Sequence, residues 1–148
     1  MPQSFSNVLV HLIFSTKNRE PLITTDIEIL LHQYLAATFK DHESPTLTIG
    51  GMPDHVHILF TLSRKITIAA MVEHAKTSSS KWIKSKDVRG FYWQSGYGAF
   101  SIGQSNVEAL KTYIANQKMH HRKKTFQGEY REFLRKYDVD YDERYVWD

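Results

Sequence analysis

The chain has 148 residues and a formal net charge of +3, and its hydrophobic and charged fractions of 41% and 24% are those of an ordinary soluble globular protein. It contains no cysteine, which excludes disulfides, thiolate metal sites and cysteine nucleophiles. No apolar run approaches the ~20 residues that span a bilayer, and residues 1–4 lack the features of a signal peptide, so we expect a cytoplasmic protein.

The first half of the chain alternates between strand and helix patterns. Residues 4–15 are apolar and rich in β-branched side chains, as in a central strand that is buried on both faces. A helical stripe of apolar residues runs through 26–42 and is followed by a short strand at 45–49. A glycine-rich turn at 50–54 then leads into the next strand, residues 55–62.

The second half continues this alternation. The spacing of apolar residues predicts a helix over 67–86 and a strand over 97–102. A capping-box pattern at 105–108 predicts the start of a third helix, which runs to about residue 120. Residues 126–137 are predicted to form a short basic helix before an acidic tail.

The order β-α-β-β-α-β-α predicts an α+β fold built from two split β-α-β units. Such units form a ferredoxin-like, four-stranded antiparallel sheet with helices on one face, here with an additional C-terminal helix. No linker or internal repeat divides the chain, so residues 1–148 are expected to form a single domain.

Positive charge is concentrated in two stretches. Residues 64–89 contain seven Lys or Arg and residues 111–136 contain eight, which is 15 of the 19 basic residues in the chain. Clustered positive charge favours nucleic acid, because binding to phosphate releases counterions. Solvated helix faces give the same pattern, so charge alone does not assign a partner.

Two histidines share one face of the predicted strand 55–62. Side chains alternate along a strand, so the apolar residues between the histidines face the core while His55 and His57 project together from the opposite face. Two neutral imidazoles at this spacing can chelate a divalent cation if a third ligand comes from elsewhere, although two exposed strand histidines would look the same. Asp54 fits either a hydrogen-bond partner of such a ligand or a turn residue.

Tyr113 and Gln117 lie four residues apart in the third predicted helix and therefore share a face. A half-buried tyrosine beside a surface glutamine would also fit this spacing. A phenol can attack a phosphodiester only if the phosphoryl group is polarised and held in line, as a cation on His55 and His57 would do. A carboxamide ligand and the absence of cysteine favour Mg²⁺ or Mn²⁺ over structural zinc.

Two motifs carry a resemblance to a known family. Met52-Pro53-Asp54-His55-Val56-His57-Ile58-Leu59 contains a His-hydrophobic-His motif, and Tyr113-Ile114-Ala115-Asn116-Gln117 contains a Tyr-x-x-x-Gln motif. Together they resemble the single-tyrosine HUH transposases, the insertion-sequence 200/605-like family that is kin to the repeat-associated tyrosine transposases. Residues 11–21, 76–81 and 93–97 also resemble this family, so the likeness runs across nearly the whole chain in the family's order.

The resemblance implies a transposase that binds single-stranded DNA with hairpin ends and nicks it with Tyr113. It implies a 5′-phosphotyrosine intermediate, which a free 3′-hydroxyl then attacks to rejoin DNA without ATP. His55, His57 and Gln117 would hold Mg²⁺ or Mn²⁺. Transposing members are homodimers, often with the tyrosine helix of one subunit completing the metal site of the other.

Other residues are candidates for supporting roles. Candidate phosphate contacts are Lys76, Lys81, Lys84, Arg122, Lys123 and Lys124. Trp93 and Tyr97 are candidates for stacking on unpaired bases, although core packing is the stronger interpretation for at least one of them. His11, Asp54 and Asn116 are candidates for orienting the metal ligands, with a core histidine the stronger interpretation of His11.

Three alternative functions stay open at this level. A domesticated repeat-associated nickase would process genomic hairpins with the same chemistry. A non-catalytic hairpin DNA-binding protein would bind DNA without regard to metal and would form no covalent adduct. A metal-dependent phosphodiesterase that activates water would cleave DNA without attachment and would tolerate Tyr113→Phe.

Overall fold

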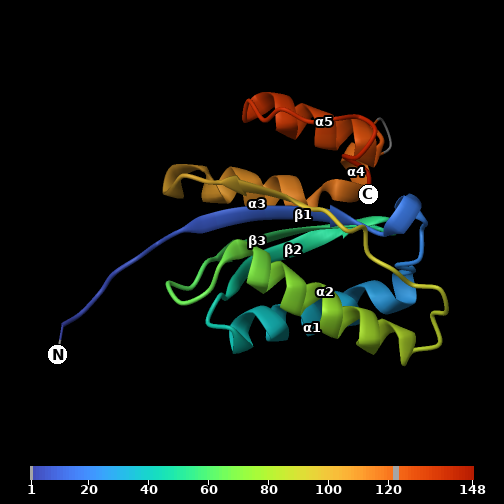
Figure 1. The fold of residues 1–148 in the computed structure, drawn as a ribbon, viewed down its shortest axis with the longest axis horizontal. Helices are drawn as coiled ribbons and strands as arrows, with labels where there is room; N and C mark the ends of the chain where they lie inside the picture. The colour runs from blue at the N-terminus through green and yellow to red at the C-terminus, as the bar shows by residue number, and fades with distance from the viewer. Residues whose placement is uncertain (1, 122–123) are drawn as a thin grey trace.

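A four-stranded antiparallel sheet with strand order β2-β3-β1-β4 forms the centre of the protein (Figure 1). The computed structural model describes residues 2–121 and 124–148. The strands are β1 (Leu9–Ser15), β2 (Thr46–Met52), β3 (His55–Thr61) and β4 (Gly98–Ser101). This element order and sheet topology confirm the ferredoxin-like α+β fold predicted from the sequence.

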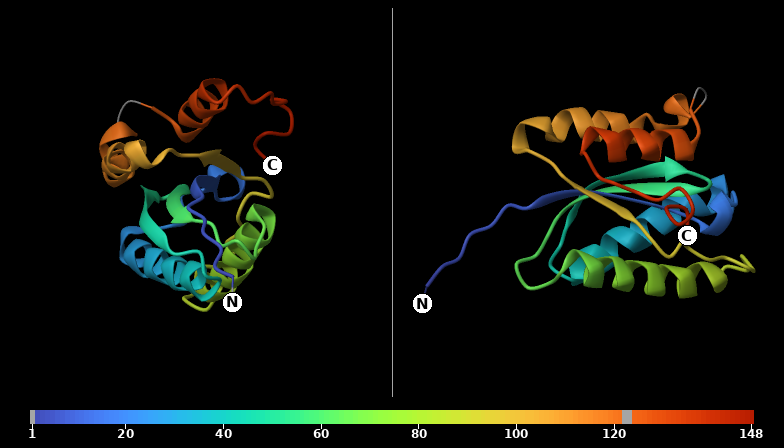
Figure 2. Two further views of the ribbon diagram at one scale, coloured as in Figure 1. Left: turned by 90° about the vertical axis from the view of Figure 1, so that its left-hand side faces the viewer. Right: turned by 45° about the horizontal axis from the view of Figure 1, so that its top comes forward.

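The helices form layers on both faces of the sheet. Figures 1 and 2 show α1 (Thr25–Asp41) and α2 (Ile68–Lys84) on one face, whereas α3 (Val107–Ala115), α4 (Gln117–His120) and α5 (Phe126–Lys136) lie over the other. Short 3-10 turns precede α1 and α3 at η1 (Lys17–Arg19) and η2 (Gln104–Asn106). Within the described ranges, no helix has both the length and the apolar character needed to cross a bilayer.

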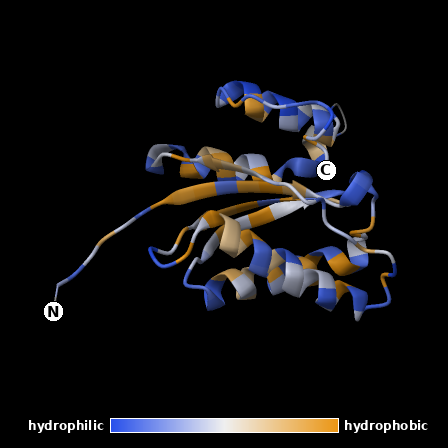
Figure 3. Cartoon of the chain, in the orientation of Figure 1, coloured by the Kyte–Doolittle hydropathy of each residue, from blue (hydrophilic) through white to orange (hydrophobic). Residues whose placement is uncertain are grey.

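The two central strands, β1 and β3, are buried on both faces, which explains their nearly continuous apolar sequences (Figure 3). On the α1 and α2 side, Val56, Ile58 and Phe60 belong to the largest hydrophobic cluster. On the other side, Leu59 packs with α3 through Ile114. Polar side chains on this second face of β3 are therefore covered by helices rather than exposed to water.

The element boundaries depart from the prediction in three places. β2 runs to Met52, so residues 50–52 extend the strand instead of forming the predicted turn. β1 begins at Leu9 rather than at residue 4, and residues 2–7 extend away from the sheet (Figure 1). The predicted third helix is broken: α3 ends at Ala115 and α4 begins at Gln117, with Asn116 between them at φ −99° and ψ 20°. The predicted capping box does not form, since the side chain at the N-cap of α3, Asn106, makes no capping bond.

Gly50 in β2 allows α3 to approach the sheet closely. A Cβ atom at this position would lie 2.5 Å from the backbone oxygen of Ile114 and 2.8 Å from its Cγ2 atom. A backbone carbonyl cannot turn aside as the end of a flexible side chain can, so a larger residue would push α3 off the sheet. Gly50 therefore helps to set the position of the helix that carries Tyr113.

Replacing Gly50 by alanine should lower the free energy of unfolding by about 1–3 kcal/mol, because the added methyl group overpacks the contact between α3 and β2. Urea denaturation measured by circular dichroism would report the change. Gly103→Ala is the matched control, since the nearest atom to a Cβ there is 3.7 Å away. Equal losses in the two variants would contradict the argument.

Candidate active site

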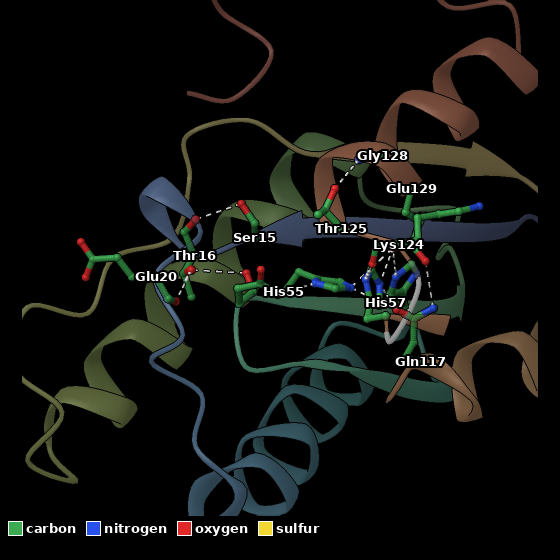
Figure 4. A network of polar contacts seen from close by, with 12 residues as sticks. Ser15, Thr16, Glu20, His55, His57, Gln117, Lys124, Thr125, Gly128 and Glu129 are labelled. Carbon is green, nitrogen blue, oxygen red and sulfur yellow. Dashed lines mark hydrogen bonds and ion pairs between the residues drawn. The ribbon is translucent and has the colours of Figure 1, made fainter. Parts of the chain in front are cut away.

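Polar side chains from β3, from α4 and from the residue after α4 converge on the carboxylate of Glu129 in α5 (Figure 4). Its Oε1 atom lies 3.0 Å from Nε2 of His57, 3.2 Å from Nε2 of His121 and 3.5 Å from Nε2 of His55. Its Oε2 atom accepts a hydrogen bond of 3.1 Å from Nε2 of Gln117. Glu129 is only 2% exposed, so this cluster is a buried polar centre between the sheet and α5.

Tyr113 belongs to the same cluster within one chain. Its hydroxyl donates a hydrogen bond to Oε2 of Glu129. Its ring centroid lies 5.9 Å from that of His57, and the side chain is half-buried. The structure therefore places the predicted nucleophile beside the predicted imidazole pair without help from a second subunit, and without sealing it in a dry core.

Neighbouring side chains orient the two imidazoles of β3. Nδ1 of His55 lies 2.7 Å from Oδ1 of Asp54, and Nε2 of His55 lies 3.0 Å from Oε1 of Gln117. Nδ1 of His57 lies 2.9 Å from Nε2 of His11, and these two rings stack. Asp54 and His11 thus hold the nitrogens that face away from Glu129, which is how the partners of metal-bound histidines are arranged.

The protonation of the cluster follows from burial and from these contacts. Burial alone would lower the pKa of His55, but its hydrogen bonds to Asp54 and Glu129 outweigh burial and raise the pKa to about 9. Burial would raise the pKa of Glu129, but hydrogen bonds from His121, His55 and His57 hold it far below its ordinary value. At neutral pH the cluster therefore pairs a carboxylate with an imidazolium.

His57 and His11 remain neutral in this setting, since burial lowers the pKa of each. Nε2 of His57 faces the Glu129 carboxylate, so it carries the proton, and Nδ1 must accept from Nε2–H of His11. Nδ1 of His11 is then an acceptor. It is buried and, within the part of the chain that the structure describes, has no hydrogen-bond partner.

Burial raises the pKa of the Tyr113 hydroxyl above its ordinary value, and the hydrogen bond to the Glu129 carboxylate raises it further. Tyr113 is therefore a protonated phenol, with an ionised carboxylate oxygen placed to accept its proton.

The donor set fits a divalent cation. Ligand atoms of His55, His121 and Glu129 lie within 4.8 Å of one another. With metal–ligand bonds of about 2.0–2.3 Å, ligands on one ion are separated by about 3–4.5 Å, so only small side-chain shifts are needed. Imidazole, carboxylate and carboxamide donors without thiolate suit Mg²⁺ or Mn²⁺. A cation would take the place of the proton that His55 holds at neutral pH.

Sequence reasoning missed Glu129 and His121. A signal for Glu129 was present, because it lies within the apolar stripe formed by Phe126, Tyr130 and Leu134 on α5. A carboxylate on the buried face of a helix needs a partner, and the partners here come from β3. Asn116, predicted to support the ligands, lies exposed at the break between α3 and α4.

Two candidate DNA contacts have structural partners instead. Trp93 is 9% exposed, and its Nε1 atom donates to Oγ of Ser79. The ammonium group of Lys76 donates to backbone oxygens of residues 94–96, and burial lowers its pKa to about 8. These contacts favour core packing for Trp93 and bracing of the 94–96 loop for Lys76.

The other candidates lie on two sides of the molecule. Lys81, Lys84 and Tyr97 line a shallow pocket along α2, on the face of the sheet away from Glu129 (Figure 1). Lys124 lies near the cluster and forms an exposed ion pair of 2.6 Å with Glu132. Arg122 and Lys123, also predicted to bind phosphate, lie outside the described residues.

Comparisons with known proteins find relatives that match most of the chain. Residues 4–117 match the family model described as "Transposase IS200 like". The ISDra2 transposase TnpA of Deinococcus radiodurans is 24% identical over 114 residues, an alignment that covers 72% of this chain and 81% of the relative. The match to the family model ends at Gln117, so Glu129 and His121 lie beyond it.

Two solved structures share the fold. A crystal structure of a transposase from Deinococcus radiodurans R1 superimposes with a TM-score of 0.62 at 21% identity, covering 79% of this chain and 98% of the other. A REP-associated tyrosine transposase bound to a REP hairpin superimposes with a TM-score of 0.61 at 14% identity, covering 82% of this chain and 73% of the other.

The charge state of His55 predicts a pH dependence of stability in the metal-free protein. Its pKa rises from 6.5 to about 9 on folding, so the folded state holds a proton that the unfolded state loses. The resulting stabilisation is complete below pH ~6.5 and decreases as the pH rises toward 9. The contribution of His55 to the free energy of unfolding should therefore fall by about 1 kcal/mol between pH 7 and 8. The lowered pKa values of His11, His57 and Lys76 contribute in the opposite direction, so urea titration in EDTA measures the net slope.

Asp54→Asn removes one of the two partners that raise this pKa, and should flatten the decrease. An unchanged slope in this variant would show that His55 does not hold the extra proton.

Proposed function

Because this chain belongs to the IS200-like transposase family, we propose that it nicks and rejoins single-stranded DNA through a covalent phosphotyrosine on Tyr113. The observation that carries the proposal is the convergence of the Tyr113 phenol, the Gln117 carboxamide and the β3 imidazoles on one buried carboxylate. A tyrosine with only a structural role does not require these neighbours, whereas a nucleophile requires both a proton acceptor and a phosphate held in place.

The proposed reaction at Tyr113 consists of two successive exchanges at phosphorus. The phenol oxygen attacks the scissile phosphate, the bond to the 3′ oxygen breaks, and the 5′ phosphate stays on Tyr113 while the 3′ oxygen leaves as a hydroxyl. In strand joining a 3′-hydroxyl attacks the phosphotyrosine and the phenol leaves. Oε2 of Glu129, already bonded to the hydroxyl, is placed to take the phenolic proton in the first exchange, while solvent water protonates the leaving 3′ oxygen. In the second exchange the attacking 3′-hydroxyl gives its proton to water, and Oε2 returns its proton to the leaving phenol.

His55, His57 and Gln117 would hold Mg²⁺ or Mn²⁺, and His121 and Glu129 add two further ligands from outside the sequence motifs. When bound, the cation would polarise the scissile phosphate and hold it in line with the phenol. The two oxygens of Glu129 have different roles, since Oε1 faces the imidazoles while Oε2 faces Tyr113 and Gln117.

We propose a DNA hairpin beside a single-stranded segment as the substrate. The REP-associated tyrosine transposase of similar fold is bound to a REP hairpin, which supports this choice. The same relative makes a repeat-associated nickase the second candidate function. A homodimer stays a prediction, and the geometry does not require one for cleavage, because the cluster is assembled from a single chain.

Tyr113→Phe should abolish the covalent protein–DNA species while leaving hairpin binding within about twofold, because one hydroxyl is lost and the ring remains. A denaturing gel after incubation with Mn²⁺ and a single-stranded hairpin library would show the adduct. Tyr97→Phe is the control for a second partly exposed tyrosine. Adduct formation by Tyr113→Phe would refute the nucleophile, and cleavage without an adduct in the native chain would favour the phosphodiesterase.

Glu129→Gln should weaken Mn²⁺ binding by at least about tenfold, because a charged ligand becomes a neutral one. Electron paramagnetic resonance of free Mn²⁺ measures this without reference to activity. Glu132→Gln is the matched control, since Glu132 is one turn away on α5 and more than half exposed. Equal affinity in both variants would exclude Glu129 from the site.

A further inference from the structure

A cavity of about 420 Å³ opens between α3 and α5 beside Tyr113. Its apolar walls come from Ile102, Leu110, Phe133 and Tyr137. None of His55, His57 and Gln117 lines it, so it is distinct from the metal ligands although it shares Tyr113 with the cluster. Its volume falls within the range of about 300–1,000 Å³ that is usual for small-ligand sites.

The walls favour a flat ligand. Phe133 and Tyr137 both stack against Phe100, with centroid distances of 5.7 and 4.8 Å, which holds their rings in place. Both rings remain half-buried rather than covered, so aromatic surface is available in the cavity. Fixed, partly exposed aromatic rings are the usual platform for unpaired bases.

The polar groups that line the cavity favour a ligand with a heterocyclic base on an anionic backbone over a ligand with an acyl chain. Lys136 lies exposed at the rim, and Lys124 is there in its ion pair with Glu132. His11 lies at the floor with its Nδ1 atom buried and without a hydrogen-bond partner among the described residues. A base carries ring and exocyclic groups that can satisfy such an atom, whereas a hydrocarbon cannot.

The position of the cavity indicates which nucleotide of the strand it binds. Tyr113 lines it, so a strand whose phosphate reaches the Tyr113 hydroxyl has the adjoining nucleotide at its mouth. We infer that the cavity between α3 and α5 binds the unstacked base of a nucleotide that flanks the scissile phosphate. This inference rests on the proposed reaction at Tyr113 for the identity of the strand, but base binding itself can be measured without any reaction.

His11 connects the cavity with the cluster, because its Nε2 atom is hydrogen-bonded to Nδ1 of His57. The Phe133 ring packs edge-on against His11 at a centroid distance of 5.1 Å, so the aromatic wall of the cavity is in direct contact with the histidine at its floor. A base that is hydrogen-bonded to Nδ1 of His11 would extend the chain of hydrogen bonds that orients His57. The cavity therefore binds the base next to the nucleophile rather than a base in a remote part of the strand.

The test is an NMR titration of the metal-free full chain with each of the four deoxynucleoside 5′-monophosphates. Binding should shift the methyl signals of Ile102 and Leu110 and the ring signals of His11. Ala109→Trp fills the mouth of the cavity from an exposed position of α3 and should weaken binding roughly tenfold. Thr112→Trp is the control, because Thr112 is exposed on the same helix but does not line the cavity.

A second probe, 2-deoxyribose 5-phosphate, has the sugar and phosphate without a base, and should leave these signals in place. Equal shifts from this probe, no shifts from any of the nucleotides, or equal weakening by the two Trp variants would overturn the inference. Phe133→Leu removes one aromatic wall and provides a second test if Ala109→Trp does not fold.

Failure of base binding leaves the Tyr113 adduct experiment untouched, so the two proposals can fail separately. Once the adduct experiment has located the cleaved bond, oligonucleotides with 2-aminopurine on its 5′ or its 3′ side identify the flanking base. Quenching of the fluorophore on one side only, lost in Ala109→Trp, is the expected result. Quenching on neither side would place the base outside the cavity.

Discussion

The buried carboxylate of Glu129 is the constraint on which the second face of the sheet depends. An isolated ionised carboxylate costs several kcal/mol or more to bury, so it persists only where charged and hydrogen-bonding partners surround it. Here the partners are the imidazolium of His55, the rings of His57 and His121, and two hydrogen-bond donors on the other oxygen. Those partners belong to β3, to α3 and to α4 with the residue after it. The helix α5 is mainly hydrophilic (Figure 3), and it is held over the sheet by these groups together with one apolar stripe, Phe126, Tyr130 and Leu134, which packs with Ile13 and Phe100.

This arrangement also explains why the nucleophile is tied to the site without being one of its ligands. Tyr113 donates to Oε2 of Glu129, whereas His57 faces Oε1, so the phenol and this imidazole are held by different atoms of one carboxylate. Gly50 sets α3 against β2 from below, and α5 restrains it from above. The position of the hydroxyl therefore follows from backbone packing on one side and from a single carboxylate on the other.

The sequence predicted the fold and the central residues because both depend on local patterns. Alternation along 55–62 was enough to place His55 and His57 on one face, and the spacing from Tyr113 to Gln117 kept those two residues together even though the helix is broken at Asn116. Glu129 could not be assigned in this way, because its imidazole partners on β3 are more than 70 residues away and only the docking of α5 brings them together. Lys76 looked like a phosphate contact until the fold supplied the carbonyl oxygens of residues 94–96.

The fold also places the two basic stretches of the sequence on opposite faces of the sheet. The basic residues of 64–89 belong to α2 and the loops around it. The described basic residues of 111–136 lie in α3, α4 and α5 or just before α5, on the opposite face of the sheet (Figures 1 and 2). A strand held at Tyr113 meets Lys124 and Lys136 first, because these line the cavity beside the hydroxyl. A single short strand cannot neutralise both faces, so contacts made by Lys81 and Lys84 would have to come from a different part of the DNA. The hairpin and the cleaved segment of one substrate are two such parts, and a substrate that combines them matches the separation of charge that the sheet imposes.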